Sequence, residues 1–280
     1  MARDRLSQGA VALVTGAGSG IGAAFAMELG RRGGQVVCTD INAATAAATA
    51  DSINAAGGQA LALGCDVTDL AALEATADKG EAWAKRPIDL VINNAGVGAG
   101  GAPVGEIPMA DWRWLMDINL WGVVHGCHLF APRFRERGRG GILNVCSTAS
   151  FAAAPTMGPY NVSKAAVLAL SETLAAEFGG TGVHVTALCP TFVKTNIARD
   201  ARTPDHAREL ASRAMTRGWP AEKVARRALD GLDRNQLYVL PQADARAIWR
   251  AKRLLPALYA RGAGLLGRLA NNPKNDTVSD

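Results

Sequence analysis

Short apolar runs, separated by longer stretches with one polar side, recur along the chain. Each run is rich in Val, Leu, Ile or Ala and is bounded by glycine or a polar residue, which is typical of buried strands. We expect strands at residues 11–15, 35–40, 60–66, 89–93, 141–146, 184–189 and 236–240. Helices are expected between them, beginning near Gly20 and at about Ala221, and spanning 43–55 and 69–85. This alternation predicts an α/β fold, a single-domain Rossmann-like doubly wound parallel sheet with helices on both faces.

Polar residues stand where the expected strands end. They are Thr15-Gly16, Asp40, Asp66, Asn93-Asn94, Ser147 and Pro190. In open parallel sheets, ligands bind outside the carboxyl ends of the strands. The sequence therefore predicts one binding site along that edge of the sheet.

The same pattern indicates the domain organisation. Residues 1–245 are expected to form one domain. The motifs described below make it a dinucleotide-binding catalytic domain, and the family resemblance that they carry implies a polar, basic and mobile substrate lid at about 196–220. Residues 246–280 form a C-terminal extension, which belongs to the same domain or covers a partner subunit. Pro256, Gly262 and Gly264 are expected to break this extension into pieces.

The extension carries most of the basic excess of the chain, whose net charge is +5. Six basic residues and no acidic one lie between Arg246 and Arg268, interspersed with leucines. Three interpretations stay open for this segment. It is a cover over a bulky hydrophobic substrate, a helix on a membrane surface, or a helix that packs on its own domain.

Composition limits the class of protein further. Of the 280 residues, 49% are hydrophobic and 20% are charged, as in an ordinary globular domain. No secretory signal is visible, and no apolar stretch approaches the ~18 residues of a membrane span. The five cysteines lack paired spacing and the four histidines lack metal-ligand spacing. We expect a cytoplasmic protein with buried, reduced thiols, no metal site and no nucleic-acid partner.

A glycine-rich turn follows the first expected strand, with glycines at positions 16, 20 and 22. Glycines permit a tight turn and close backbone approach, and the N-terminus of the following helix presents N–H groups to a pyrophosphate. A turn of this kind without a ligand is the alternative interpretation. No Gly-Lys-Ser/Thr follows, so the motif is not a P-loop.

Asp40 ends the second expected strand. A carboxylate at this position can accept hydrogen bonds from both ribose hydroxyls of NAD and would repel the 2′-phosphate of NADP. No basic residue adjoins it, and Ser19 stands where an arginine could bind a phosphate. The sequence therefore favours NAD, although Asp40 can also cap the next helix.

Lys164 follows Tyr160 by four positions, which places the two side chains on one face of a helix. A free tyrosine has a pKa near ~10, and a neighbouring cation favours the phenolate and lowers that pKa. Such a pair suits proton exchange with a carbonyl or an alcohol. By itself this spacing is weak evidence for a catalytic pair, since most Tyr and Lys residues at this spacing are ordinary residues on a helix surface.

Together these motifs resemble the short-chain dehydrogenase/reductase family over about residues 8–200. The segment 15–22 is similar to the family's cofactor turn, Asp66-Val67 to its adenine-side pair, and residues 93–96 to the segment after its fourth strand. Asn119, Ser147, Tyr160 and Lys164 match the family's catalytic tetrad in order and spacing. The resemblance implies a cofactor site formed by Gly16, Ser19, Gly20, Ile21, Gly22, Asp40, Ile41, Asp66, Val67, Asn93, Ala95, Gly96, Tyr160, Lys164, Pro190, Val193 and Thr195.

The resemblance also implies a role for each member of the tetrad. Tyr160 exchanges a proton with the substrate oxygen, Ser147 stabilises the developing negative charge on that oxygen, and Lys164 lowers the tyrosine pKa and holds the nicotinamide ribose. Asn119 anchors a water that relays protons to Lys164. Thr191 departs from the family pattern, which usually has glycine after this proline, and the local turn is therefore in question.

The small residues near the tetrad indicate a roomy apolar pocket for a bulky, hydrophobic or aromatic secondary alcohol or ketone. Its expected walls are Ala149, Phe151, Ala152, Met157 and Thr191. Two alternatives remain, an NADP-dependent 3-oxoacyl or other carbonyl reductase and a non-catalytic NAD-binding regulatory protein. The family resemblance implies a homotetramer or homodimer formed through the helices near residues 105–130 and 155–178.

Overall fold

The computed structural model describes residues 5–270, except for the side chains of residues 266, 269 and 270. Residues 271–280 of the predicted extension lie outside the described residues. A seven-stranded parallel sheet has the order β3-β2-β1-β4-β5-β6-β7. Its strands are β1 (Val11–Thr15), β2 (Gln35–Asp40), β3 (Gln59–Gly64), β4 (Leu90–Asn93), β5 (Gly140–Val145), β6 (Val183–Leu188) and β7 (Tyr238–Val239).

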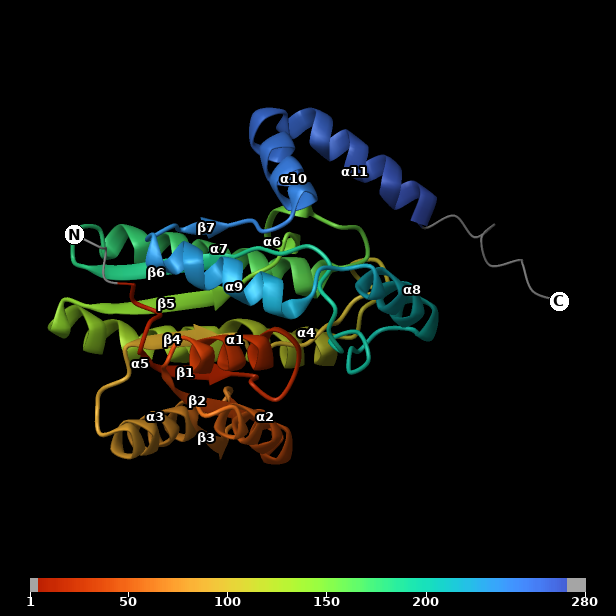
Figure 1. Cartoon of the computed structure of the whole chain (residues 1–280). Coiled ribbons are helices and arrows are strands. Elements are labelled where there is room, and N and C mark those ends of the chain that lie inside the picture. The colour runs from red at the N-terminus through yellow and green to blue at the C-terminus, as the bar shows by residue number, and fades with distance from the viewer. Residues whose placement is uncertain (1–4, 271–280) are drawn as a thin grey trace.

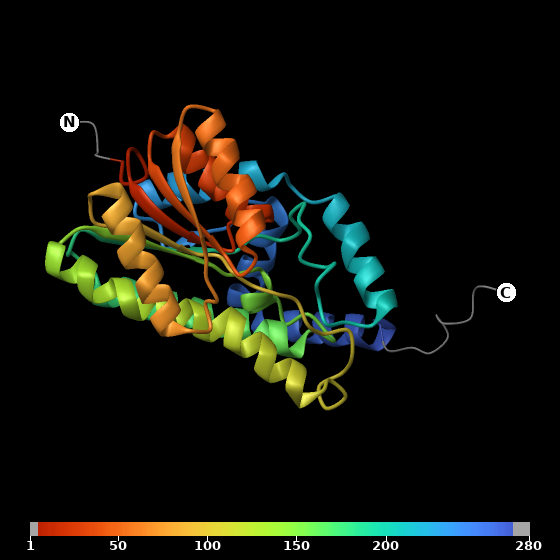
Figure 2. The same cartoon turned by 90° about the horizontal axis from the view of Figure 1, so that it is seen from below.

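Helices cover both faces of the sheet (Figures 1 and 2). One face packs on α1 (Gly20–Arg31), α2 (Ala43–Ala55) and α9 (Ala221–Asp233). The other packs on α3 (Leu70–Ala84), α5 (Gly122–Arg137) and α7 (Gly158–Glu177). The remaining helices are α4 (Met109–Met116), the π-helical turn η1 (Asp117–Trp121), α6 (Ala149–Ala152), α8 (Asp205–Thr216), α10 (Ala243–Leu254) and α11 (Pro256–Ala270). The predicted doubly wound fold is confirmed.

The strands form where the apolar runs were found, because both faces of a parallel sheet are buried. Every residue of β1, β4 and β5 is buried. The strand order reverses between β1 and β4, and this switch point opens the crevice in which such folds bind ligands. The glycine-rich turn after β1 and the segment after β4 therefore lie next to each other.

Element boundaries differ from the expected ones by one or two residues. β3 ends at Gly64, so Cys65 and Asp66 follow the strand, and β7 is limited to Tyr238–Val239. The expected break at Pro256 is present, because α10 ends just before it and α11 begins with it. The break predicted at Gly262 and Gly264 is wrong, since α11 continues through both glycines. A single glycine costs a helix only about 1 kcal/mol.

All five cysteines are buried and free, which confirms the prediction of buried thiols. Burial raises the pKa of Cys38 and of Cys127 to about 12. Thiols of this kind carry almost no thiolate at neutral pH and are poor nucleophiles. Their contribution is to the core on either side of the sheet.

A buried ion-pair cluster joins the N-terminal segment, α1 and α9. Arg32 lies 2.9 Å from Glu28, 2.8 Å from Asp230 and 3.2 Å from Asp233. Asp233 also accepts hydrogen bonds from the Ser7 main-chain N–H and hydroxyl, each at 2.8 Å. Arg32, Glu28 and Asp233 are largely buried, so each depends on its partners for compensation of its charge.

Replacing Arg32 with alanine should lower the free energy of unfolding by about 3 kcal/mol, because it leaves buried carboxylates unpaired. Chemical denaturation measures this directly. The adjacent Arg31→Ala is a matched control, since the Arg31 side chain is 60% exposed although it also pairs with Glu28, and its cost should stay below about 1 kcal/mol. Equal effects of the two substitutions would contradict a special role for Arg32.

Candidate active site

The glycine-rich turn leaves no room for side chains. A Cβ at Gly22 would lie 2.0 Å from the Gly16 carbonyl oxygen, and one at Gly18 would lie 2.1 Å from the Thr45 hydroxyl. Gly16 and Gly20 have positive φ angles of 64° and 55°, which favour glycine. The backbone of the turn is therefore exposed to any group that enters the crevice.

The N-terminus of α1 keeps its main-chain donors available. Ser19 occupies the N-cap position in an extended conformation and its side chain makes no capping hydrogen bond. The first turn of α1 contains no acidic residue. These N–H groups and the helix dipole suit an anion such as a pyrophosphate.

Thr15 and Asn94 join this turn to the segment after β4. The Thr15 hydroxyl accepts hydrogen bonds from the main-chain N–H groups of Asn94 and Ala95, at 3.0 and 3.1 Å. The Asn94 side chain donates to the carbonyl oxygens of Thr15 and Gly16, at 2.8 and 3.1 Å. Both residues belong to motifs seen in the sequence. Their positioning role, however, depends on hydrogen bonds between two segments that lie about 79 residues apart in the chain.

Asp40 lies at the end of β2 and contacts the same turn. Its carboxylate accepts the Gly18 N–H at 3.0 Å and the Asn42 N–H at 3.0 Å. Asn42, and not Asp40, caps α2 by accepting from the N–H groups of Ala44 and Thr45. The neighbouring Ile41 side chain is 76% exposed. Within residues 5–270, no ion pair neutralises Asp40.

The predicted adenine-side pair is found after β3. Asp66 accepts from the N–H and the hydroxyl of Thr68, at 2.9 and 2.8 Å. Val67 is buried against Gly122, and its carbonyl oxygen lies 2.9 Å from Nδ1 of His125. His125 thus has a structural contact, and no group of three potential metal ligands occurs among the described residues.

The Asn93 side chain lies beneath the predicted cofactor site, in the core of the sheet. Its side chain is buried and donates to the Asn144 side-chain oxygen at 2.8 Å. A Cβ at Gly126 would lie 2.0 Å from the Asn93 side-chain oxygen, so the amide points into the interface with α5. Asn93 therefore stabilises the sheet beneath the site, and its side chain does not face the crevice. Its place at the end of a strand gave no indication of the direction of the side chain.

Lys164 and Asn119 meet beside Gly96. A Cβ at Gly96 would lie 3.2 Å from Oδ1 of Asn119 and 3.5 Å from Nζ of Lys164. Lys164 is 3% exposed and its ammonium donates to the Val145 carbonyl oxygen at 2.8 Å. Three predicted site residues from separate parts of the chain are thus brought together at the ends of β4 and β5.

Asn119 lies in the π-helical turn η1 between α4 and α5 and is fully buried. Its side chain accepts from the Val97 N–H at 2.8 Å and donates to the Val97 carbonyl oxygen at 2.9 Å. Single π turns within helices are common at functional sites. Here the amide fixes the loop after β4, and its role in a proton relay stays a prediction.

Ser147 and Tyr160 complete the group. Ser147 lies just after β5, and its hydroxyl oxygen accepts the Ala149 N–H at 3.1 Å. Burial raises the pKa of Tyr160, while a hydrogen bond with Ser147 opposes that rise. Burial also lowers the pKa of Lys164.

The direction of the Tyr160 shift differs from the expectation that Lys164 lowers it. The Lys164 ammonium lies 5.9 Å from the centre of the Tyr160 ring and is directed to the Val145 carbonyl. In this arrangement the loss of water around the buried phenol is the main cause of its raised pKa.

The loop after β6 is held from both sides. The Pro190 carbonyl oxygen accepts the hydroxyl and the N–H of Thr148, at 2.8 and 2.9 Å. Thr195 lies across the crevice from the glycine-rich turn, since a Cβ at Gly20 would be 3.0 Å from its methyl group. Val193 is buried and pairs with Trp219.

Thr191 connects this loop to the start of α10. Its hydroxyl donates to Asp244 at 3.2 Å, and its N–H donates to the buried Gln242 side chain at 3.2 Å. Gln242 also donates to the Phe192 carbonyl oxygen at 3.1 Å. The departure from the family pattern therefore has a local function, because threonine offers Asp244 a hydroxyl that glycine lacks.

Replacing Gln242 with alanine should weaken NADH binding roughly tenfold, because it leaves the Thr191 N–H and the Phe192 carbonyl, in the loop after β6, without their partner. NADH titration followed by fluorescence measures the change. Gln59→Ala is the matched control, since Gln59 pairs with Gln35 on the exposed surface. An unchanged NADH dissociation constant in Gln242→Ala would refute the coupling of this side chain to the site.

The segment predicted to be a substrate lid has a fixed base. Arg202 lies 3.1 Å from Asp111, and its guanidinium sits 4.0 Å over the Trp114 ring. Its main-chain N–H donates to Gly98 at 3.0 Å. No residue of α8 is buried, so the expected mobility applies to this helix and stays a prediction. A cleft of about 410 Å³ lies at the base of the lid, and none of the tetrad lines it.

The residues predicted to form the pocket walls lie in different surroundings, some beside the loop after β4 and some in the core. Met157 lies beside Gly100, whose Cβ would be 3.0 Å from its sulfur atom. Phe151 belongs to the buried core between the sheet and its helices, and is not an open wall. Ala153 and Thr156, in the loop between them, have positive φ angles of 51° and 62°. Such backbone strain in non-glycine residues is often found at functional sites.

The residues present fit a nicotinamide dinucleotide. The glycine turn and the α1 N-terminus suit the pyrophosphate, and Asp40 suits a ribose diol at the end of β2. Ser147, Tyr160 and Lys164 stand at the opposite end of the crevice, where a reactive carbon needs a proton donor or acceptor close by.

Comparison with known proteins agrees with this arrangement. A family model described as short chain dehydrogenase matches residues 10–206. The chain is 36% identical to a probable oxidoreductase EphD of Mycobacterium tuberculosis over 87% of its own length, but spans only 43% of that relative. It is 40% identical to D-threitol dehydrogenase of Mycolicibacterium smegmatis (69% of this chain, 74% of the relative) and 34% identical to 7alpha-hydroxysteroid dehydrogenase of Escherichia coli (79% and 86%).

Solved structures show the same fold. A short chain dehydrogenase/reductase from Burkholderia phymatum in complex with NAD superposes with a TM-score of 0.84 at 33% identity, covering 90% of this chain and 95% of that one. A short-chain dehydrogenase from Sphingobium yanoikuyae in complex with NADPH gives a TM-score of 0.73 at 28% identity, covering 91% and 94%. The chain belongs to the short-chain dehydrogenase/reductase family, whose members are oxidoreductases that bind a nicotinamide cofactor.

Proposed function

We propose that the protein interconverts a secondary alcohol and a ketone with NAD, and that its substrate is bulky and hydrophobic or aromatic. The convergence of Ser147, Tyr160 and Lys164 at the end of β5, opposite a glycine turn that contacts Asp40, carries this proposal. A non-catalytic binding protein has no need for these three side chains together.

In the proposed reaction a bound nicotinamide supplies or accepts the hydride. The Tyr160 hydroxyl lies ready to give a proton to the substrate oxygen during reduction and to take it back during oxidation. Ser147, whose hydroxyl lies next to the Tyr160 phenol, orients the substrate oxygen and stabilises its negative charge. Lys164 is held in place by Val145 and orients the ribose, and Asn119 keeps the adjoining loop in position.

The choice of NAD rests on Asp40. Its carboxylate faces the turn at the position of the ribose, and the neighbouring Ile41 and Asn42 offer no cation. A 2′-phosphate would meet this negative charge without compensation. The related structures contain NAD in one case and NADPH in another, so the family alone does not determine the cofactor.

The substrate class is testable with a graded panel of secondary alcohols and ketones, from small aliphatic through diaryl to steroidal, with both cofactors. The relatives include dehydrogenases of a small polyol and of a hydroxysteroid. We expect kcat/KM to rise with the size and apolarity of the substrate. Activity confined to threitol-like polyols would contradict the bulky-substrate proposal and leave the oxidoreductase assignment intact.

The pH dependence should follow the raised pKa of Tyr160. Oxidation needs the phenolate, and burial keeps the phenol protonated to a higher pH than usual. The kcat/KM for alcohol oxidation should therefore continue to rise from neutral into alkaline pH, while ketone reduction persists at neutral pH and falls in the alkaline range. Initial rates in both directions test this, and an oxidation rate that is already level below neutral pH would disagree with it.

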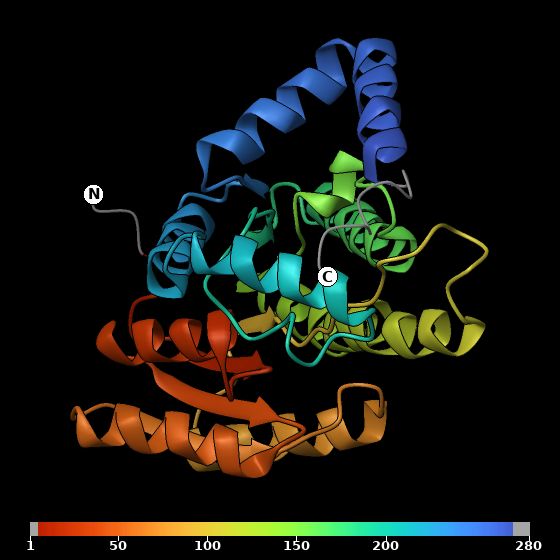
Figure 3. The ribbon, with the colours of Figure 1, turned by 90° about the vertical axis from the view of Figure 1, so that its right-hand side faces the viewer.

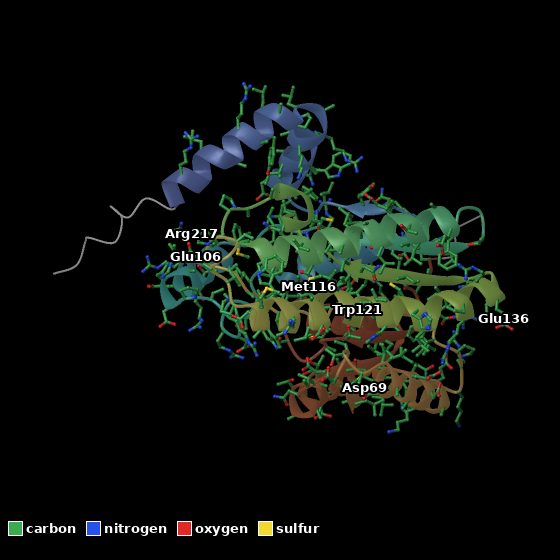
Figure 4. All side chains as sticks on the ribbon, turned by 180° about the vertical axis from the view of Figure 1, so that it is seen from behind. Asp69, Glu106, Met116, Trp121, Glu136 and Arg217 are labelled. Carbon is green, nitrogen blue, oxygen red and sulfur yellow. The ribbon has the colours of Figure 1, made fainter. Side chains whose placement is uncertain are left out.

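We further propose a homotetramer or homodimer built through the α4–α5 and α7 helices. Trp121, the last residue of η1, is 52% exposed, and Val162 on α7 is 47% exposed. Figure 4 shows Met116 and Trp121 labelled along this pair of helices. Light scattering of a Trp121→Glu variant checks this, and we expect a smaller particle than for the unaltered chain.

A further inference from the structure

The C-terminal helices α10 and α11 form a hairpin that stands off the body of the protein (Figures 1 and 3). Among the described side chains of α11, two positions on one side of the helix contact the body. The Tyr259 hydroxyl donates to the Ala152 carbonyl oxygen at 2.6 Å, and a Cβ at Gly267 would lie 3.5 Å from Pro155. These two contacts establish which side of α11 faces the protein.

The opposite side of α11 is apolar and basic. Leu258 and Leu265 are seven residues apart, as are Arg261 and Arg268, so each pair recurs on the same side of the helix. Both leucines are 60% exposed, and Leu254 and Leu255 at the elbow are 75% and 55% exposed. We call these positions the outer strip, formed by Leu254, Leu255, Leu258, Arg261, Leu265 and Arg268.

Beyond Asp244 in the first turn of α10, the charge of this hairpin has one sign. Six basic residues and no acidic one lie between positions 246 and 268. Arg253 is directed inward, 3.7 Å from Glu172, and Arg246 donates to the carbonyl oxygens of Leu240 and Pro241. Arg250, Arg261 and Arg268 are exposed. A partner of the outer strip must therefore accept leucine side chains and carry negative charge.

A second copy of this chain meets that requirement poorly. A twofold contact places the same patch on both sides of the interface. It would bring Arg261 and Arg268 against the arginines of the other copy, and like charges in contact are unfavourable. The strip has the composition of helices that lie in a membrane interface, with leucines beside basic residues. No helix among the described residues is long and apolar enough to cross a membrane.

We propose that the outer strip binds the surface of an anionic lipid bilayer. The leucines enter the boundary between headgroups and acyl chains, and the arginines pair with lipid phosphates. The hairpin then lies on the surface while its inner side keeps its contact with the loop after α6. This inference rests on the hairpin alone and does not depend on the proposed reaction.

Vesicle flotation tests the proposal with the full chain. Vesicles of phosphatidylglycerol and phosphatidylcholine should carry the protein, whereas vesicles of phosphatidylcholine alone should carry far less, and high salt should release it. Arg261→Ala with Arg268→Ala should weaken binding roughly thirtyfold, at about 1 kcal/mol for each basic residue. Leu258→Ala with Leu265→Ala should weaken it at least about tenfold.

Leu210→Ala is the matched control, because Leu210 is a 64% exposed leucine on α8. This variant should bind vesicles like the unaltered chain. The proposal is overturned if all protein stays in solution with anionic vesicles at low salt, or if the strip variants float as well as the control. It is also overturned if the strip variants change only the particle size in light scattering, which would make the strip a subunit interface.

Discussion

Replacing Tyr160 with phenylalanine should reduce turnover roughly a thousandfold, while NADH binding remains within a factor of about three. The hydroxyl is the group that exchanges the proton with the substrate oxygen, and such general acid–base groups contribute about 10²–10⁴-fold to a rate. The ring keeps its place beside Lys164, so the architecture of the site is preserved. Steady-state rates together with an NADH titration measure the two quantities separately.

Tyr238→Phe provides the control for this substitution. Tyr238 is also a partly buried tyrosine, but it lies on β7, outside the site, and its hydroxyl donates to Glu172 at 2.6 Å. Its removal should change turnover less than about twofold. Turnover that survives in Tyr160→Phe at half of its original rate or more would exclude Tyr160 as the proton donor.

Replacing Asp40 with asparagine should raise the ratio of kcat/KM with NADP to that with NAD at least about tenfold. Asparagine retains an oxygen that can accept the Gly18 N–H but lacks the charge that opposes a 2′-phosphate. Removing one unit of charge a few ångströms from a phosphate changes the interaction by about 1–4 kcal/mol, depending on the local dielectric. Initial rates with both cofactors at constant ionic strength provide the ratio.

The same measurement on Asp51→Asn controls for a general change in surface charge, because Asp51 is exposed on α2. Its cofactor ratio should be unchanged. An Asp40→Asn variant that keeps the original preference would show that discrimination arises elsewhere on the chain.

The fold and the order of the site residues could be predicted because both depend on patterns within short segments of the sequence. Apolar runs marked every strand to within two residues, since burial on both faces imposes the same composition along each strand. The glycine turn is likewise a local signal, because tight backbone approach excludes side chains at positions such as Gly18 and Gly22.

Contacts between distant segments could not be predicted in this way. The resemblance implied a cofactor contact for Asn93, but no local signal showed that its side chain turns toward Asn144, 51 residues away. The function of Thr191 depends on Gln242, also 51 residues away. The Tyr160 pKa is raised mainly by burial, and helix spacing reveals the nearby cation but not the burial.

The C-terminal helices illustrate a different difficulty. Gly262 and Gly264 suggested breaks, but the structure keeps α11 continuous and anchors it through Tyr259. Anchoring of one side can offset a helix penalty of about 1 kcal/mol for each glycine. Helix propensity alone therefore predicted the break between α10 and α11 at Pro256 correctly and the two later breaks incorrectly.

Transfer of a labelled hydride tests the central claim most directly. The protein is mixed with NADH in which both hydrogens on the reactive carbon of the nicotinamide are deuterium and with a set of bulky ketones, and the alcohols formed are analysed by mass spectrometry. We predict one deuterium on the carbinol carbon of each product molecule, and almost no product with Tyr160→Phe. Tight binding of NADH with no deuterium transferred to any ketone or related carbonyl compound would contradict the proposed enzyme and favour a non-catalytic binding protein.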